Sequence, residues 1–164
     1  ICPRTLMPRL ALDAIDLKIL RILRDEGRIT NVALAARVGI SPPPCLRRVR
    51  ALEQAGYIHG YHAELDADLI GYEVTAFCNV GLVSQAEADL KSYEALVRSW
   101  PNVRECHMLM GEDDFILKVM APSVEELNAF IISHLTSAPN VKNVKTAICI
   151  RRSDRKPSVP VPTV

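Results

Sequence analysis

Three arginines stand close together in the first third of the chain, at Arg47, Arg48 and Arg50. A guanidinium group can bind phosphate oxygens or the edge of a guanine base, so arginines on one side of a helix suit a groove of DNA. At about 100° per residue, Arg47 and Arg50 fall opposite an apolar arc, and Arg48 falls at its flank. The arc contains Cys45, Leu46, Val49 and Leu52. The spacing therefore predicts a half-buried helix whose exposed side could contact DNA.

A run of arginines taken alone is more often a solvated helix face. Here a short helix and a turn at Gly39 precede it, and the arginine-bearing helix begins with Ser41 and three prolines, as in a helix-turn-helix. Base contacts in that motif come mainly from the first part of its second helix. The expected DNA contacts are therefore Ser41, Pro43, Pro44 and Arg47 near the bases, with Arg48 and Arg50 on phosphates.

Two other groups of reactive residues lie in the second half. The stretch Gly111–Asp114 is typical of an ordinary acidic hairpin turn, by turn chemistry alone. Cys106 and His107 are adjacent on an expected strand, so their side chains point to opposite faces, and no third ligand or acid is spaced to join them. We interpret both as packing or interface residues. Five widely spread cysteines without a C-x-x-C pair likewise indicate no metal site.

The elements that would hold the arginines are three helices in about 45 residues. The first is predicted between Asp13 as N-cap and Gly27 as stop, with apolar residues at the 3.6-residue period. The second is expected from Asn31 as cap to Gly39, which can adopt a left-handed conformation. Ser41 would cap the third helix, because prolines are tolerated in a first turn. Residues 57–66 are expected to form a short strand or connector.

The second half alternates strand and helix patterns. Strands are expected at 73–83, 103–110, 114–121 and 141–152, and helices at 85–99 and 124–137, where Ser123 and Glu126 make a capping box. This βαββαβ order is that of ferredoxin-like sandwiches. The predicted domains are 1–62 as DNA-binding unit, 63–72 as linker, 73–153 as αβ domain and 154–164 as flexible tail.

The two halves of the chain differ in charge, although the net charge of the whole chain is only +1. Residues 1–65 hold ten Lys or Arg against six Asp or Glu, whereas residues 66–164 hold ten against thirteen. The basic N-terminal part, residues 1–65, is suited to phosphate binding. Residues 1–7 lack the apolar region of a secretory signal, and no apolar run approaches the roughly 20 residues that span a bilayer, which favours a cytoplasmic protein without membrane association.

A series of short motifs over about residues 12–152 resembles the leucine-responsive/asparagine-regulator (Lrp/AsnC) family of transcription factors. The matching residues are Leu12-Asp13-x-x-Asp16-x-x-Ile19-Leu20, Gly27-Arg28, Leu34-Ala35, Gly39-x-Ser41, Arg48-Val49-x-x-Leu52-Glu53-x-x-Gly56-x-Ile58 and Gly111-x-x-Asp114. Each motif is weak, but their order is specific. The stretches 41–50 and 105–111 look most like the leucine-responsive branch.

The resemblance implies an α+β fold in which an N-terminal winged helix-turn-helix is joined by a linker strand to a βαββαβ ferredoxin-like, ACT-like sandwich. Such sandwiches pair subunits into homodimers and often build octamers. Effectors in the family are usually amino acids, here leucine-like as a first guess. They bind between subunits around a turn, which in this sequence is Met110, Gly111, Glu112, Asp113 and Asp114. Glu112 and Asp113 depart from the family, where an aromatic residue is frequent, and add negative charge.

The residue types of the expected effector turn are suited to binding an amino acid. Glycine lets a ligand approach the backbone closely, exposed N–H groups of a turn can hold a carboxylate, and an Asp accepts from an ammonium group. Asp114 is the leading ammonium partner.

The sequence therefore predicts a sequence-specific regulator that binds double-stranded DNA and an amino acid, without a cofactor. An alternative is an amino-acid-binding regulatory subunit of an enzyme, since βαββαβ domains also serve there. A second is a small enzyme using Cys106, His107 or the acidic turn. Phosphate-loop, dinucleotide-binding and serine-hydrolase motifs are all missing from the sequence, so we predict that the protein is not an enzyme.

Overall fold

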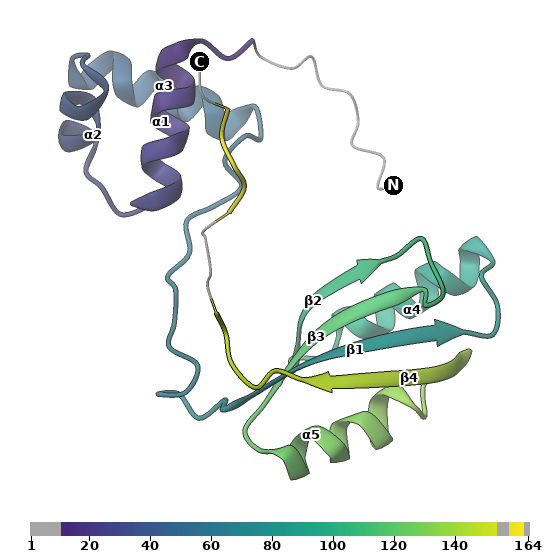
Figure 1. Ribbon diagram of the computed structural model, residues 1–164. Coiled ribbons are helices and arrows are strands. Elements are labelled where there is room, and N and C mark those ends of the chain that lie inside the picture. Colours follow the sequence, from purple (N-terminus) through teal and green to yellow (C-terminus); the bar gives the residue numbers. More distant parts are fainter. Residues whose placement is uncertain (1–10, 154–157, 163–164) are drawn as a thin grey trace. The chain divides into compact units, whose positions relative to one another are not determined.

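The computed structural model describes residues 11–153 and 158–162, which form two compact units (Figure 1). The head comprises residues 11–64 together with 158–162, and the αβ unit comprises residues 65–153. The predictions about residues 1–7 and about most of the tail at 154–164 lie outside the described residues.

The head contains three helices, α1 (Ala14–Asp25), α2 (Asn31–Val38) and α3 (Pro42–Gln54). Asp13 caps α1 as predicted, in a capping box with Asp16, but α1 ends before Gly27. Thr30 caps α2 and not Asn31, because the Thr30 hydroxyl already accepts from the N–H of Ala33 and makes Asn31 the first helical residue. Gly39 adopts the left-handed conformation at φ 89°, which turns the chain from α2 into α3.

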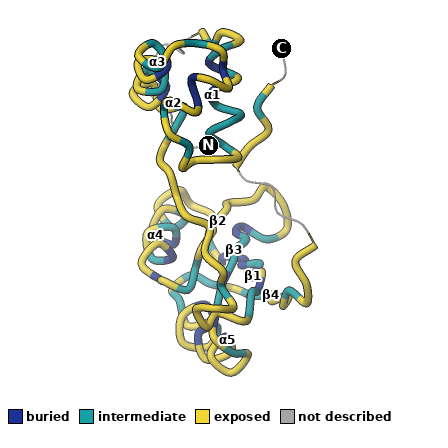
Figure 2. Tube along the Cα trace, turned by 90° about the vertical axis from the view of Figure 1, so that its left-hand side faces the viewer, coloured by how far each residue is buried: buried dark blue, intermediate teal, exposed yellow. Residues whose placement is uncertain are grey.

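A small core holds these helices together, as the burial colours in Figure 2 show. Its fully buried members come from all three helices: Ile19, Leu34, Ala35, Val38, Cys45 and Leu52. Residues 57–66 follow as a connector without strand hydrogen bonds, since no neighbouring strand offers a ladder in the described part of the chain.

The αβ unit has the predicted βαββαβ order. Its elements are β1 (Val74–Leu82), α4 (Glu87–Arg98), β2 (Val103–Met108), β3 (Phe115–Ala121), α5 (Val124–Phe130) and β4 (Val141–Ile148). The strand order is β2-β3-β1-β4 and every pair is antiparallel, which is a ferredoxin-like sheet. The expected helix at 124–137 is α-helical only as far as Phe130, and a π-helical turn, Ile131–Leu135, completes it.

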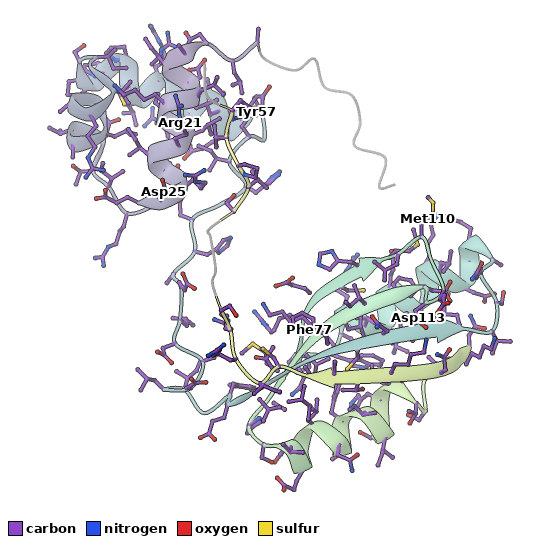
Figure 3. All side chains as sticks on the ribbon, viewed as in Figure 1. Arg21, Asp25, Tyr57, Phe77, Met110 and Asp113 are labelled. Atoms are coloured by element: carbon purple, nitrogen blue, oxygen red, sulfur yellow. The ribbon has the colours of Figure 1, made fainter. Side chains whose placement is uncertain are left out.

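The two faces of the sheet differ. Residues alternate in burial along β3, so that Phe115 and Leu117 pack under α4 and α5 in one core while Ile116 and Lys118 lie on the opposite face. Phe77 of β1, labelled in Figure 3, lies on this second face and is 40% exposed. Two helices therefore cover one face of the sheet, and no helix or strand of the αβ unit, as far as its residues are described, covers the other. Among those residues no helix is long and apolar enough to cross a membrane.

Candidate DNA-binding helix and effector turn

Helix α3 presents the residues that the sequence assigned to DNA. Ser41 and Pro43 lie at its start and are exposed, while Pro44 is half-buried. Arg47 and Arg50 are exposed, and within the described residues neither side chain has a hydrogen bond or ion pair. Two unneutralised guanidinium groups therefore extend from one side of a helix whose other side is anchored by Cys45 and Leu52.

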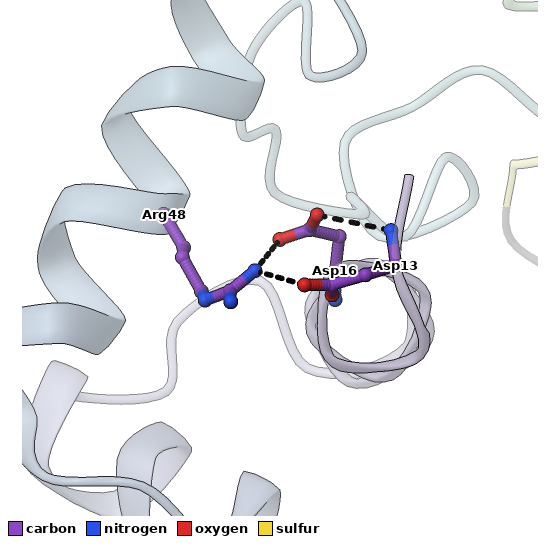
Figure 4. A network of polar contacts seen from close by, with 3 residues as sticks. All are labelled: Asp13, Asp16 and Arg48. Carbon is purple, nitrogen blue, oxygen red and sulfur yellow. Dashed lines mark hydrogen bonds and ion pairs between the residues drawn. The ribbon is translucent and has the colours of Figure 1, made fainter. Parts of the chain in front are cut away.

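Arg48 has a different environment from its two neighbours (Figure 4). Its Nη1 donates to Asp13 Oδ2 at 2.7 Å and to Asp16 Oδ1 at 2.8 Å, which ties α3 to the first turn of α1. The pKa of Asp13 lies below its ordinary value because the backbone N–H of Asp16 donates to it and Arg48 adds a second donor. Hydrogen bonds to Asp16 and Asp13 likewise raise the pKa of Arg48. This arginine therefore orients α3 on the rest of the head.

Replacing Arg48 by Met is expected to lower the free energy of unfolding of the head by about 1–2 kcal/mol. The substitution keeps the apolar stem but leaves the largely buried Asp16, with a side chain 8% exposed, without its cationic partner. Urea unfolding followed by circular dichroism measures the loss. Arg37→Met is the matched control, because the Arg37–Glu26 pair is about half exposed and should contribute little. Equal destabilisation by both variants would contradict this role of Arg48.

The turn between β2 and β3 gathers the residues expected to bind an effector (Figure 3). Met110 at its tip is fully exposed, and the side chain of Glu112 is 95% exposed. A Cβ added at Gly111 would meet no atom within 4 Å, so open space adjoins the backbone there. The N–H groups of Gly111 and Glu112 make no hydrogen bond to any described residue. Exposed backbone donors at an open glycine are suited to a small anionic group.

Asp114 lies at the base of this turn and is 8% exposed. Its Oδ2 accepts from the N–H of Leu82 at 2.7 Å and its Oδ1 accepts from Nε2 of Gln85 at 2.8 Å. The backbone of Asp114 also bonds on both sides, since its N–H donates to Val80 and its carbonyl accepts from Leu109. Asp114 therefore fixes the turn to the end of β1, and each of its carboxylate oxygens keeps one further lone pair.

Asp113 is paired with β4. Lys145 Nζ lies 3.3 Å from its Oδ2, and Asn143 Nδ2 donates to its Oδ1 at 3.4 Å. Lys145, Asn143 and Gln85 also lie beside the turn and were not predicted from the sequence. No local motif marks them, because only the pairing of β1 with β4 and the turn after β1 bring them there. The negative charge of the turn is thus partly neutralised from within the fold.

Cys106 and His107 do not form a reactive pair. Their side chains lie on opposite faces of β2, as expected from their adjacency. Burial of the thiol, and next the charge of Glu94, raise the pKa of Cys106 to about 11, which keeps it protonated at neutral pH. His107 lies 3.4 Å from Glu105. No group of three His, Cys, Asp or Glu among the described residues could hold a metal ion.

Both units of this chain match known protein families. A family model described as the Lrp/AsnC ligand binding domain matches residues 75–159, and one described as winged helix-turn-helix DNA-binding matches residues 12–59. A leucine-responsive regulatory protein of Rhizobium meliloti (strain 1021) is 55% identical over 144 residues, which cover 88% of this chain and 92% of that protein. The chain belongs to the Lrp/AsnC family.

Other Lrp/AsnC proteins agree with this assignment. The HTH-type transcriptional regulator AldR of Mycolicibacterium smegmatis (strain ATCC 700084 / mc(2)155) is 39% identical over 137 residues. These residues cover 84% of this chain and 80% of that protein. A transcriptional regulator from Neisseria meningitidis, solved as a complex with L-Met, superposes with a TM-score of 0.86 at 34% identity, covering 91% of this chain and 96% of its own. These relatives are transcriptional regulators, so the predictions of a DNA-binding regulator of this fold that is not an enzyme are confirmed.

Proposed function

We propose that this Lrp/AsnC regulator binds specific sites on double-stranded DNA through α3 and changes its DNA affinity when an amino acid binds at the turn 110–114. The proposal of DNA binding is supported by Arg47 and Arg50, which are exposed on a helix-turn-helix and have no partner among the described residues. Arg47 is assigned to a base edge together with the N-terminal residues Ser41, Pro43 and Pro44, and Arg50 to phosphate. Arg48 is assigned to orienting α3, since two carboxylates already hold it.

The proposed binding of an amino acid depends on the geometry of the turn at residues 110–114. The N–H groups of Gly111 and Glu112 would hold the α-carboxylate of the amino acid. The free lone pairs of Asp114 would accept from its ammonium group, while Lys145 offsets the charge of Asp113. A leucine-like side chain is the first candidate, because several relatives are named leucine-responsive and one was solved with L-Met. Binding of L-Leu but not D-Leu is expected.

We also propose that subunits pair through the open face of the sheet. Phe77, Ile116 and Met120 lie on that face around Lys118, which is opposite Phe77 and forms an ion pair with Glu105. A dimer with two-fold symmetry would bury this surface against its own copy and place two α3 helices for successive major grooves. Sedimentation velocity distinguishes monomer, dimer and the octamer that we expect from dimers. A monomer at micromolar concentration would contradict the pairing.

Fluorescence anisotropy with the DNA upstream of the protein's own gene tests the regulator proposal directly. We expect tighter binding to this DNA than to a scrambled fragment of equal length, with affinity that falls as salt rises because counterions are released from phosphates. Adding L-Leu, L-Met or other amino acids in turn should shift the affinity for one chemical class. Equal affinity for both fragments at every salt concentration would contradict sequence-specific regulation.

Gly111→Ala is expected to weaken effector binding at least about tenfold while leaving stability within about 0.5 kcal/mol of the original. A methyl group there meets nothing in the fold, so a loss of binding would arise from the ligand's own approach. Isothermal titration calorimetry with L-Leu and L-Met measures it, and urea unfolding provides the stability control. Unchanged affinity in the variant would place the effector elsewhere.

A further inference from the structure

The C-terminal residues Ser158–Pro162 belong to the same compact unit as the helices of the head. They line one side of a groove of about 810 Å³ whose other walls come from α1 and from residues 57–64. Figures 1 and 2 both show this end of the chain beside the head helices. The groove walls include Leu17, Leu20, Leu23, Tyr57 and Tyr61. Leucines and tyrosines thus face the C-terminal segment, together with charged groups such as Arg24 and Glu64.

Helix α1 carries more apolar residues than the head core uses. Ile19 is fully buried among the three helices, and Ile15 and Ile22 pack against the same core. Leu17 lies outside that core yet is not an exposed residue, and it lines the groove. Leu20 packs against the head core and also lines the groove, and Leu17, three residues before it on the same helix side, extends this apolar stripe beyond the core. Such a stripe needs an apolar neighbour from outside the helix bundle.

The far wall of the groove is held firmly in place. The N–H of Tyr57 donates to the carbonyl of Leu52 at 2.9 Å. The Tyr61 hydroxyl donates to Glu53 at 3.0 Å, and the ring packs close to Gly27, where an added Cβ would lie 3.5 Å from it. Burial, followed by the bond to Glu53, raises the pKa of Tyr61 to about 12. Hydrogen bonds to Leu52 and Glu53 thus orient the two tyrosines along the groove.

The sequence of the segment fits a groove of this kind. Residues 159–162 read Val-Pro-Val-Pro, so proline alternates with a β-branched residue. Prolines favour the extended polyproline II conformation, which loses little entropy on binding and is commonly held by aromatic-lined grooves. Val161 is partly buried in this arrangement, whereas Val159 is 66% exposed. Val161 is therefore the residue most engaged with the head.

We propose that the Val159–Pro162 segment docks in the groove between α1 and residues 57–64 of its own chain, as a second attachment of the head. Nine residues, 149–157, separate the end of β4 from Ser158, and such a chain spans at most about 32 Å at 3.6 Å per residue. A short connection of this kind gives millimolar effective concentration, which favours the chain's own tail over that of another copy. The head would then be connected to the effector domain by two segments, so a change at β4 could reach the DNA-binding helices directly.

Photo-crosslinking of the full chain tests the docking independently of DNA or effector. Replacing Val161 by p-benzoylphenylalanine and irradiating should give crosslinks to peptides from α1 or residues 57–64, identified by mass spectrometry. The same probe at Val83, which is 72% exposed in the αβ unit, should give none to these peptides. Leu17→Asp in the Val161-probe chain is expected to reduce the crosslink at least fivefold. The matched Val32→Asp should not, because Val32 on α2 is 67% exposed and does not line the groove.

An equimolar mixture of ¹⁴N- and ¹⁵N-labelled chains distinguishes the two sources of the tail. Docking within one chain gives crosslinked peptides of a single isotope only. Mixed-isotope pairs would show that the tail comes from another copy and would overturn the proposal, as would crosslinks that avoid the groove. Because the readout needs neither DNA nor amino acid, its failure leaves the regulator proposal intact, and failure of that proposal leaves the docking intact.

Discussion

Arg47→Ala is expected to weaken binding to the preferred DNA about 10- to 100-fold and to reduce its preference over scrambled DNA. Losing one good arginine–base contact costs about 1–3 kcal/mol, and the N-terminal part of a recognition helix is where such contacts are made. The substitution should leave the head folded, because Arg47 is exposed and joined to no described residue. Anisotropy titrations on both fragments at several salt concentrations measure affinity and preference together.

Arg50→Ala separates phosphate contact from base contact. It should weaken binding to both fragments by a similar factor. The slope of log affinity against log salt concentration should fall in magnitude by about 0.9, since one phosphate contact is lost. Arg98→Ala on α4 removes the same charge from the αβ unit and serves as the matched control. If Arg98→Ala reduced affinity as strongly as Arg47→Ala, the effect would be one of overall charge, and the assignment of α3 to the groove would fail.

Asp114→Ala is expected to lower the free energy of unfolding of the αβ unit by about 2–3 kcal/mol and to abolish effector binding. The carboxylate is 8% exposed and accepts from a backbone N–H of Leu82 and from Gln85, so its removal leaves a buried donor without a partner. Urea unfolding monitored by the fluorescence of Trp100, which belongs to the core of this unit, measures the loss.

Glu112→Ala is the control for the same turn. Its side chain is 95% exposed, so stability should stay within about 0.5 kcal/mol of the original. Asp114→Asn adds a further test, because the amide keeps the shape and one acceptor oxygen but lacks the negative charge for an ammonium group. If Asp114→Asn bound the amino acid as well as the original chain, Asp114 would support the turn without binding the ligand.

Arg47 and Arg48 are assigned different roles, and the difference depends on α1 as well as α3. Arg47 and Arg48 are neighbours in sequence, yet Arg47 has no partner among the described residues whereas Arg48 is held by Asp13 and Asp16. The family motif that begins at Leu12 thus serves two purposes at once. It caps α1, and its carboxylates fix the rotation of α3 so that Arg47 and Arg50 face outward. Loss of Arg48 should therefore affect DNA binding through the orientation of the helix.

Much of the fold follows from local signals in the sequence. Asp13 capped α1 and Gly39 took the left-handed turn between α2 and α3, and the strand expected at 114–121 is present as β3. Caps, glycine turns and periodicity act within a few residues, so one stretch of sequence contains the whole cause. The basic N-terminal part and the outward positions of Arg47 and Arg50 also followed from spacing alone.

Only the tertiary structure decided which polar groups have partners. Asp114 bonds to Leu82 and Gln85, about thirty residues away, and Lys145 reaches Asp113 from β4. The pairing of Arg48 with Asp16 likewise joins residues 32 positions apart. Sequence periodicity assigns a side chain to a face but not to a neighbour, because strand register and helix packing are set by the fold as a whole. Those long-range contacts determine whether a charge supports the structure or is left for DNA or a ligand.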